Sequence, residues 1–225
     1  MKRNFLSIIT VIVVLFTSCA KDNFEAPGSL LTGRVVYQNL PVGVRSNGVQ
    51  LELWQSGFQL FSKIPVFISQ EGTFSARLFD GEYKLTRLKG NGPWLDNTDT
   101  IAVSVKGNTI IDVPIDPFFT VKNEKFVKSG TAINATFNLQ RVNTSKPLEL
   151  VRLYIGQTNI TDQNNNAGNV QLLASAIPDP TQIITLSANI PAALANKDFV
   201  FARVGVKTVG VAELLYSMPI KVMLK

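Results

Sequence analysis

Cysteine and histidine, the residue types behind much of protein catalysis and metal binding, are almost missing from this sequence. The 225 residues contain one cysteine, Cys19, and no histidine. Thiolate and imidazole supply the usual zinc ligands, the Ser-His-Asp and Cys-His nucleophile systems and the sulfur atoms of disulfides. The chemistry left to the chain is therefore carboxylate catalysis, as in glycosidases, or coordination of calcium by oxygen atoms.

Neither of these two chemistries has a complete set of residues. A glycosidase needs two carboxyl groups about 5 to 10 Å apart in a cleft, and Glu52, the only acid beside an outward-facing aromatic residue, has no partner that the sequence identifies. The polar segments 96–99 (DNTD) and 162–166 (DQNNN) lack the glycine and the distal glutamate of an EF-hand loop, which favours solvated turns. We predict no enzyme activity, no metal and no cofactor.

Tryptophan is the side chain best suited to hold a sugar, because its ring packs on the apolar face of a pyranose while neighbouring polar groups bind the hydroxyls. Trp94 lies in the loop GNGPWLDNTD, with Asn91 and Asp96 beside it. Loops carry function more often than strands do. We therefore predict a ligand site at Trp94, Asn91 and Asp96. The alternative is that Trp94 closes the end of its own domain or the domain junction.

Trp54 is the second candidate for ligand binding, together with Glu52. In the segment VQLELW, residues 49–54, apolar residues alternate with Gln50, Glu52 and Trp54. Since successive side chains of a strand point to opposite faces, this alternation predicts that Trp54 and Glu52 face outward. The alternative is that the following loop or another domain covers Trp54.

Further along the chain, two segments gather aromatic and basic residues on one strand face. Arg152 and Tyr154 share a face of LELVRLYIG, and Phe199, Phe201 and Arg203 share a face of DFVFARV. Each face fits either the core of a second sheet or an interface between domains.

The elements that position these residues are strands. Alternation with a period of two recurs along the chain, as in IAVSV (101–105), whereas helical periodicity is hard to find after Cys19. Turn signals at Glu71-Gly72 and Asp80-Gly81 separate short strands at regular spacing. This pattern predicts an all-β chain of sandwiches or barrels.

Two domains are expected, with a boundary near residue 118, where Pro114 and Pro117 interrupt the strands. Residues 31–118 resemble a transthyretin-like or carboxypeptidase-regulatory-like sandwich, in the segments GRVV (33–36), VQLEL (49–53), GTF (72–74) and GEYKL (81–85). Residues 119–225 alternate cleanly in TAINATFNLQRV, which indicates a sheet with one wet face. This half resembles an immunoglobulin-like or fibronectin-like sandwich. We predict two tandem β-sandwich domains.

The N-terminus has the anatomy of a secretory signal. Lys2 and Arg3 precede an apolar run, residues 5–16, that is well short of the roughly 18 residues a membrane-spanning helix needs. Thr17, Ser18 and Cys19 then resemble the lipobox of bacterial lipoproteins. The resemblance implies cleavage of a signal peptide, residues 1–18, and lipidation of Cys19.

Residues 19–30 would then form a lipidated tether that anchors the protein stably, because several acyl chains enter the bilayer. Lys21, Asp22 and Glu25 resemble the surface-export signal of Bacteroidota lipoproteins. Removal of residues 1–18 takes away Lys2 and Arg3, which leaves 20 basic against 16 acidic residues, a net charge of +4. This charge is mild and scattered, so we predict no nucleic-acid binding.

The whole architecture resembles an uncharacterised family of two-domain lipoproteins of Bacteroidota, encoded near Sus-type glycan-uptake systems. The resemblance implies a lipid-anchored protein of the outer membrane, displayed at the cell surface, with polysaccharide and SusC/SusD-like outer-membrane proteins as partners. We expect an accessory glycan-binding or scaffolding component of such a system. The alternative is a structural or adhesive lipoprotein that binds proteins through an exposed strand edge and has no sugar ligand.

Overall fold

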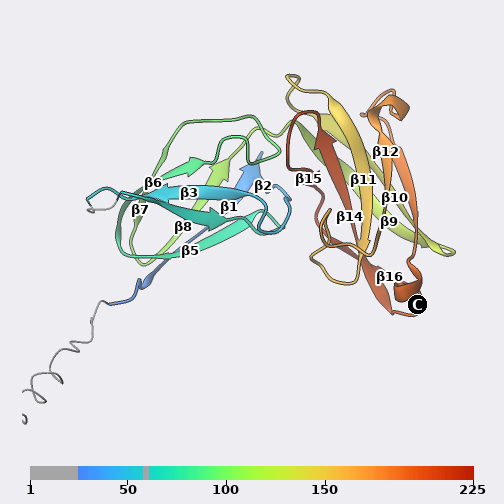
Figure 1. Cartoon of the computed structure of the whole chain (residues 1–225), viewed down its shortest axis with the longest axis horizontal. Coiled ribbons are helices and arrows are strands. Elements are labelled where there is room, and N and C mark those ends of the chain that lie inside the picture. The colour runs from blue at the N-terminus through green and yellow to red at the C-terminus, as the bar shows by residue number, and fades with distance from the viewer. Residues whose placement is uncertain (1–24, 58–60) are drawn as a thin grey trace, which may run out of the picture.

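Strands make up most of the computed structural model, which describes residues 25–57 and 61–225. Strands β1–β8 form a first domain and β9–β16 a second one (Figure 1). The predicted all-β fold of two tandem sandwiches is confirmed. No helix within the described ranges is long and apolar enough to cross a membrane. The predicted signal peptide, Cys19 and the tether up to residue 24 lie outside these ranges.

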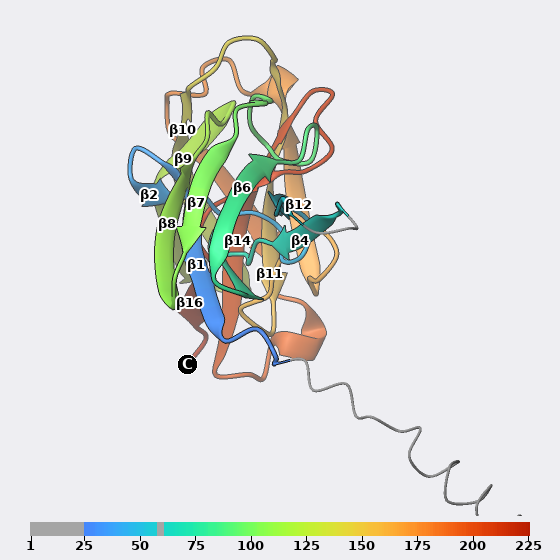
Figure 2. The same ribbon diagram turned by 90° about the vertical axis from the view of Figure 1, so that its left-hand side faces the viewer.

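The first domain packs two sheets face to face. Its strands are β1 (Ser29–Tyr37), β2 (Leu40–Pro41), β3 (Gln50–Trp54), β4 (Lys63–Phe67), β5 (Thr73–Leu78), β6 (Gly81–Arg87), β7 (Ile101–Val105) and β8 (Asn108–Pro114). In one sheet β1 pairs antiparallel with β2 and β5 and parallel with β8, and the other sheet has the order β4-β3-β6-β7. Figure 2 shows this domain in front. β1 begins two residues before the predicted domain start.

Alternation decides which residues of the first domain are buried. Leu31, Leu53 and Leu85 are fully buried between its two sheets, while their strand neighbours point outward. Burial of apolar surface contributes roughly 25 cal/mol for each Å² removed from water, so these inward rows supply most of the stabilisation of the domain.

The second domain follows after a short segment, residues 115–118. Its elements are β9 (Phe119–Ser129), β10 (Ala132–Arg141), β11 (Leu148–Gly156), β12 (Gly168–Leu173), β13 (Ile184–Asn189), β14 (Phe199–Thr208), β15 (Leu215–Tyr216) and β16 (Ile220–Met223), with two 3-10 helices, η1 (Ala174–Ala176) and η2 (Ala192–Leu194). Sheet β13-β10-β9 faces sheet β12-β11-β14, which β15 and β16 extend. This is the two-sheet arrangement of immunoglobulin-like domains.

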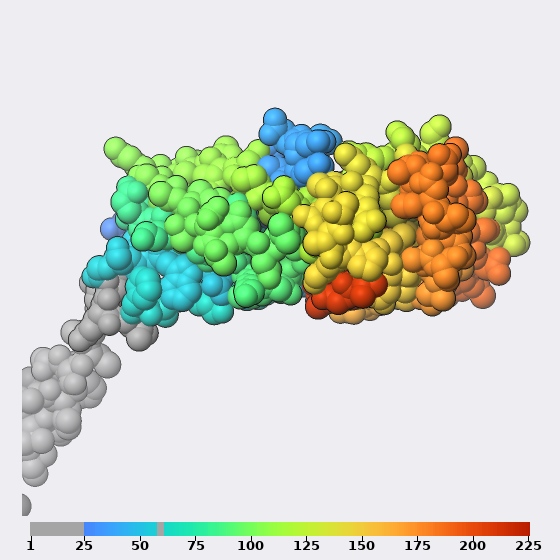
Figure 3. Space-filling model, turned by 90° about the horizontal axis from the view of Figure 1, so that it is seen from above, coloured from blue at the N-terminus to red at the C-terminus, as the bar shows by residue number. Residues whose placement is uncertain are grey.

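The two domains join end to end without a visible gap (Figure 3). The contact is formed by the loop after β2 and the turn after β4 from the first domain, and by β14, β15 and the turn before β15 from the second. The residues that meet at this junction are far apart in the sequence, so only the tertiary structure shows which of them are in contact.

Candidate functional site

Trp94 is buried, with 4% of its surface exposed, and belongs to the core of the first domain. The ring lies so close to the backbone of Gly92 that a Cβ there would be 2.1 Å from the ring atom Cε2. A backbone bridge to Pro117 and a hydrogen bond from the Leu95 amide to the Asp116 carbonyl (2.8 Å) hold the loop down. Trp94 therefore closes the domain, and the predicted stacking role is wrong because the ring is covered.

Asn91 and Asp96 shape the same loop instead of facing a ligand. Asn91 Oδ1 accepts a hydrogen bond from the Gln50 amide (2.7 Å), and its Nδ2 donates one to the Gly48 carbonyl (3.2 Å). Asp96 is exposed, and its Oδ1 accepts the amide of Gly90 (2.7 Å). Both side chains bind backbone groups of the first domain, so their polar atoms serve the loop conformation.

Trp54 is half-buried, and its ring centroid lies 5.2 Å from that of Phe61. Glu52 faces outward as predicted but is only 9% exposed, and it accepts a hydrogen bond from Lys63 Nζ (2.6 Å). The strand register explains this pair, because Trp54 lies opposite Lys63 and Glu52 is two residues away on the same face. The carboxylate is neutralised by the lysine.

The two tryptophans do not form one platform. Asn91, from the Trp94 loop, binds the first residue of β3, whereas Trp54 is the last residue of that strand. Four residue steps along the strand separate these positions by about 13 Å. The five predicted site residues therefore fall into two separate groups.

Of the two strand faces that gather aromatic and basic residues, the one with Arg203 meets the first domain at the domain interface. Arg203 has no exposed surface, and its Nη2 donates to two first-domain carbonyls, those of Val44 (3.0 Å) and Gln70 (2.7 Å). Its Nε donates to the Ser217 carbonyl (2.7 Å), and the guanidinium lies 4.4 Å from the Tyr216 ring centroid. Burial lowers the pKa of Arg203 to about 10, so it remains charged at neutral pH.

Two further contacts reinforce this junction. Arg45 of the first domain binds Glu213 of the second through Nε (3.1 Å) and Nη2 (2.5 Å). The Tyr216 amide donates to the Gly43 carbonyl (3.0 Å). Paired guanidinium and carboxylate groups of this kind fix orientation as well as distance, so the two domains form a single unit.

The polar segment 162–166 folds against the junction. Asp162 is fully buried, and its Oδ1 accepts the amides of Asn164 (2.8 Å) and Asn165 (2.9 Å). This is the turn geometry that the sequence favoured over a calcium site, with Asn164 and Asn165 exposed and Asp162 buried beneath them. Within the described ranges, no group of three or more acidic side chains is placed to hold a metal ion.

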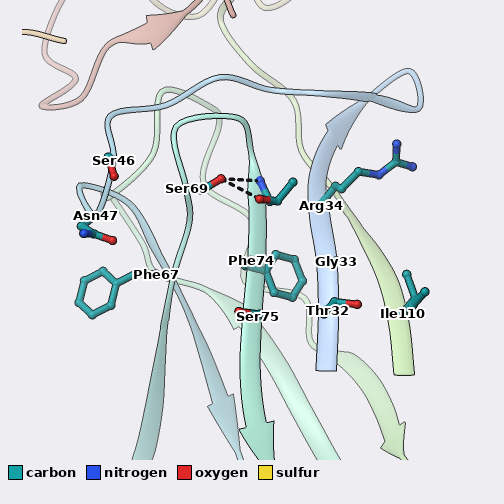
Figure 4. A pocket seen from close by; sticks show the side chains of 11 residues that line it. Thr32, Gly33, Arg34, Ser46, Asn47, Phe67, Ser69, Phe74, Ser75 and Ile110 are labelled. Carbon is teal, nitrogen blue, oxygen red and sulfur yellow. Dashed lines mark hydrogen bonds between the residues drawn. The ribbon is translucent and has the colours of Figure 1, made fainter. Parts of the chain in front are cut away.

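A groove of about 520 Å³ runs over the outer face of the first domain, where β1, β5 and β8 lie beside the end of β4 (Figure 4). Its floor is made of small hydroxyl side chains: Thr32, Thr73 and Ser75. Strand pairing sets them side by side, since Thr32 lies opposite Ser75 on one flank. Ser69 Oγ accepts the Thr73 amide (3.2 Å), which ties the turn after β4 to the floor.

Apolar side chains form the two walls. Phe67 on β4 is 50% exposed on one wall, with Ser46 and Asn47 beside it, and Ile110 on β8 is 79% exposed on the other. Ile110 lies opposite Thr32, which lies opposite Ser75. The four neighbouring strands β4, β5, β1 and β8 therefore set the two walls about 14 Å apart, which is wide enough for a sugar ring between them.

Gly33 makes room for tight packing beneath the groove. Phe74, opposite Gly33 in the register, is buried and lays its ring against it. A Cβ at Gly33 would come within 2.0 Å of the Ile111 carbonyl oxygen and 2.5 Å of Phe74 Cζ. No side chain larger than hydrogen fits, so this position is fixed by packing beneath the groove.

One charged residue, Arg34, is found among the described residues that line the groove, and it lies opposite Asp112 on the paired strand. Arg34 donates through Nε to Oδ1 (3.0 Å) and through Nη2 to Oδ2 (2.5 Å) of Asp112. These hydrogen bonds raise the pKa of Arg34 and lower the pKa of Asp112. Both groups stay ionised and neutralise each other.

Sequence reasoning did not identify this groove. The signal was present in part, because Phe67 alternates with the buried residues Val66 and Ile68 as Trp54 alternates with its own neighbours. Alternation marks Phe67 as outward, yet it does not reveal that Ile110, more than forty positions later, stands across from it. Only strand pairing brings the two walls together.

Comparison with known families covers both domains. Residues 29–116 match the family described as "Protein of unknown function (DUF3823) N-terminal domain". Residues 119–221 match the family described as "Domain of unknown function (DUF3823_C)". No curated protein sequence matches the chain.

Solved structures with the same two-domain fold come from Bacteroides and Parabacteroides species. A DUF3823 family protein from Bacteroides ovatus is 39% identical, with a TM-score of 0.82, and one from Parabacteroides merdae is 35% identical, with a TM-score of 0.81. A protein from Bacteroides uniformis, described as a candidate carbohydrate binding protein, is 20% identical, with a TM-score of 0.72. Each match covers 88% of this chain and 100% of the solved chain. The first two support shared family membership, and the third shows a shared fold.

Proposed function

This chain belongs to the DUF3823 family of Bacteroidota, and on that premise we propose that it is a lipid-anchored, glycan-binding accessory protein of the outer membrane. It would act at the cell surface beside a Sus-type uptake system. The proposed mechanism is tethering and capture: lipid holds the chain at the membrane, and the first domain contacts polysaccharide.

The lining of the first-domain groove is the observation that favours a sugar as the ligand. Phe67 and Ile110 offer exposed apolar surfaces on its two sides, and hydroxyl groups cover the floor between them. An aromatic ring set beside hydrogen-bonding groups matches a sugar, which has apolar C–H faces and a rim of hydroxyls. Trp94 has no part in this contact, since it is buried in the core.

We propose binding without catalysis. Hydrolysis of a glycosidic bond requires a pair of carboxyl groups about 5 to 10 Å apart at the bond. Within the part of the chain that the structure describes, the residues lining the groove include no aspartate or glutamate, and the neighbouring Asp112 is held by Arg34. The groove is therefore equipped to hold a sugar rather than to cleave it.

Phe67→Ala is expected to weaken polysaccharide binding roughly tenfold, because about 1.5 kcal/mol of aromatic contact would be lost. The measurement is affinity electrophoresis in gels that contain plant or host polysaccharides, followed by calorimetry with the polymers that retard the protein. Phe79→Ala is the matched control, because Phe79 is an equally exposed phenylalanine of the same domain outside the groove.

Unchanged retardation of Phe67→Ala, with the protein folded, would remove the groove from the mechanism. If no polysaccharide retards the wild-type protein, glycan capture itself is wrong. Circular dichroism of both variants ensures that lost affinity does not come from lost structure.

Cys19→Ala is expected to move the protein from the membrane fraction to the soluble fraction and to abolish its labelling by fatty acid. The thioether-linked and amide-linked acyl chains would be lost together, and these supply the stable part of the anchor. Asn23→Ala, four residues further along the proposed tether, serves as the control and should leave labelling unchanged. Acyl labelling that persists in Cys19→Ala would contradict the lipoprotein assignment.

The alternative function, protein binding through a strand edge, has one observation in its favour. β9 pairs with β10 and with no other strand of the described residues. A groove of about 350 Å³ lies beside β9, lined by its residues 120–124, by 40–43 and by 215–218. An unpaired edge beside an apolar groove can receive an extended peptide by strand addition. A partner bound there would be insensitive to Phe67→Ala.

A further inference from the structure

We infer that the groove between Phe67 and Ile110 selects neutral polysaccharides and rejects acidic ones, an inference that rests on the proposed glycan-binding function. It concerns the charge of the sugar rather than its linkage. Three observations support this inference: Arg34 is the single cation among the described lining residues, Asp112 neutralises it, and the other polar groups of the lining are uncharged.

Among the described residues that line the groove, Arg34 is the only cation, and its most directional donors are already used. Nε and Nη2 each bind a different oxygen of Asp112, at 3.0 and 2.5 Å. This two-point geometry leaves the carboxylate and guanidinium facing each other. An approaching carboxylate or sulfate would meet Arg34 and Asp112 as a pair with no net charge, so it would gain little Coulomb attraction.

The strand register makes this pairing a feature of the fold. Arg34 and Asp112 are direct partners in the parallel pairing of β1 and β8. Side chains on one face at paired positions of neighbouring strands lie close enough to interact. Figure 4 shows Arg34 directed away from the Phe67 wall. The cation therefore sits at the rim beside its acid, and the space between the walls is left without charge.

The remaining polar groups suit hydroxyls. Thr32, Thr73 and Ser75 each carry a hydroxyl that both donates and accepts, and Asn47 offers an amide with the same two capacities. A neutral sugar can exchange its bonds to water for bonds to these groups. An anion would give up part of its hydration with no unpaired cation to replace it, which is costly. The groove therefore discriminates by charge.

Matched pairs of polymers test this inference. The probes are polygalacturonate, alginate and hyaluronan, each beside its carboxyl-methylated form, together with neutral mannan, xylan and dextran, in affinity electrophoresis at low ionic strength. We expect wild-type protein to be retarded by neutral polymers and at least threefold less by an acidic polymer than by its methylated form.

Asp112→Asn should alter the preference. It leaves the Arg34 guanidinium without its acid, so retardation by acidic polymers should rise at least threefold, while binding to neutral polymers should stay within about twofold. Asp198→Asn is the matched control. It removes an exposed acid that pairs with Lys225 in the second domain, so it changes the net charge equally but far from the groove.

The outcomes of these measurements distinguish a failure of the charge inference from a failure of the proposed glycan binding. If wild-type protein prefers an acidic polymer to its methylated form, the charge inference fails and glycan binding stands. If Asp112→Asn gains nothing over Asp198→Asn, the neutralised arginine is not the cause of selection, and the inference also fails. If no polymer retards the wild-type protein, the proposed function fails first.

Discussion

Arg203→Met is expected to lower the free energy of unfolding by about 3–5 kcal/mol, the range for removing one member of a buried charged network. Arg203 donates hydrogen bonds to carbonyls in both domains, namely those of Val44, Gln70 and Ser217. Methionine fills a similar volume but donates nothing, and each buried carbonyl left without a donor costs about 1–3 kcal/mol. One substitution therefore removes three hydrogen bonds at the junction.

Arg203→Met should also weaken the coupling between the two domains. Interfaces between domains of one chain resemble transient protein interfaces, and domains move unless such an interface is well formed. In the wild-type protein we expect a single thermal transition. In Arg203→Met we expect it to fall by roughly 10 °C and to separate into two, since a change of 1 kcal/mol moves the midpoint by about 2–4 °C in a protein of this size.

Differential scanning calorimetry and small-angle X-ray scattering check these expectations. Arg141→Met is the control, because Arg141 is an exposed arginine of the same domain whose hydrogen bond, to the Thr144 carbonyl, is local. Its other contact, with the Phe119 ring at 5.9 Å, also stays within the second domain. Surface substitutions of this kind usually change stability by less than about 0.5 kcal/mol. An Arg203→Met variant that melts with the wild-type protein and keeps its scattering profile would show that other contacts hold the domains.

Trp94→Ala is the second large effect, with an expected loss of about 3–5 kcal/mol, the range for truncating a buried tryptophan. The ring packs in the first-domain core and over Gly92, so its removal leaves a cavity that the loop cannot fill. Binding to polysaccharide by the folded fraction should be unchanged, because Trp94 is not among the residues that line the groove.

Chemical denaturation measures the stability change, and affinity electrophoresis measures binding in the same preparations. Trp54→Ala is the comparison, since Trp54 is half-buried and mainly loses its contact with Phe61. We expect its cost to be about 1–2 kcal/mol, well below that of Trp94→Ala. A Trp94→Ala protein of normal stability that no longer binds polysaccharide would restore Trp94 as a ligand contact.

For Trp94, the sequence predicts the loop but not the direction in which the ring points. The glycines, proline and polar residues around it mark an exposed loop correctly, since residues 95–100 are exposed. The ring itself folds inward, where Gly92 leaves room for it and where residues 115–118 pair with the backbone of the loop. Loop composition indicates that the backbone is near the surface, but it does not reveal which way one side chain turns.

The faces of strands were easier to predict than their surroundings. Alternation placed Glu52 and Trp54 on an outer face and Leu51 and Leu53 inside, as the structure shows. For Arg203 it predicted a shared face but left core and interface as alternatives. The structure decides for the interface, because the first domain presents its carbonyls to that face.

What the sequence determined by itself follows from local rules: strands instead of helices, two sandwiches, and no histidine or second cysteine for catalysis or disulfides. Side-chain alternation is set by neighbouring residues, and residue counts need no structure, so both can be read from the sequence alone. Tertiary structure alone decided which outward residues are covered, and it set Phe67, Thr32 and Ile110 around one groove. Strand pairing joins residues far apart in the chain, and no local pattern encodes which strand will be the neighbour.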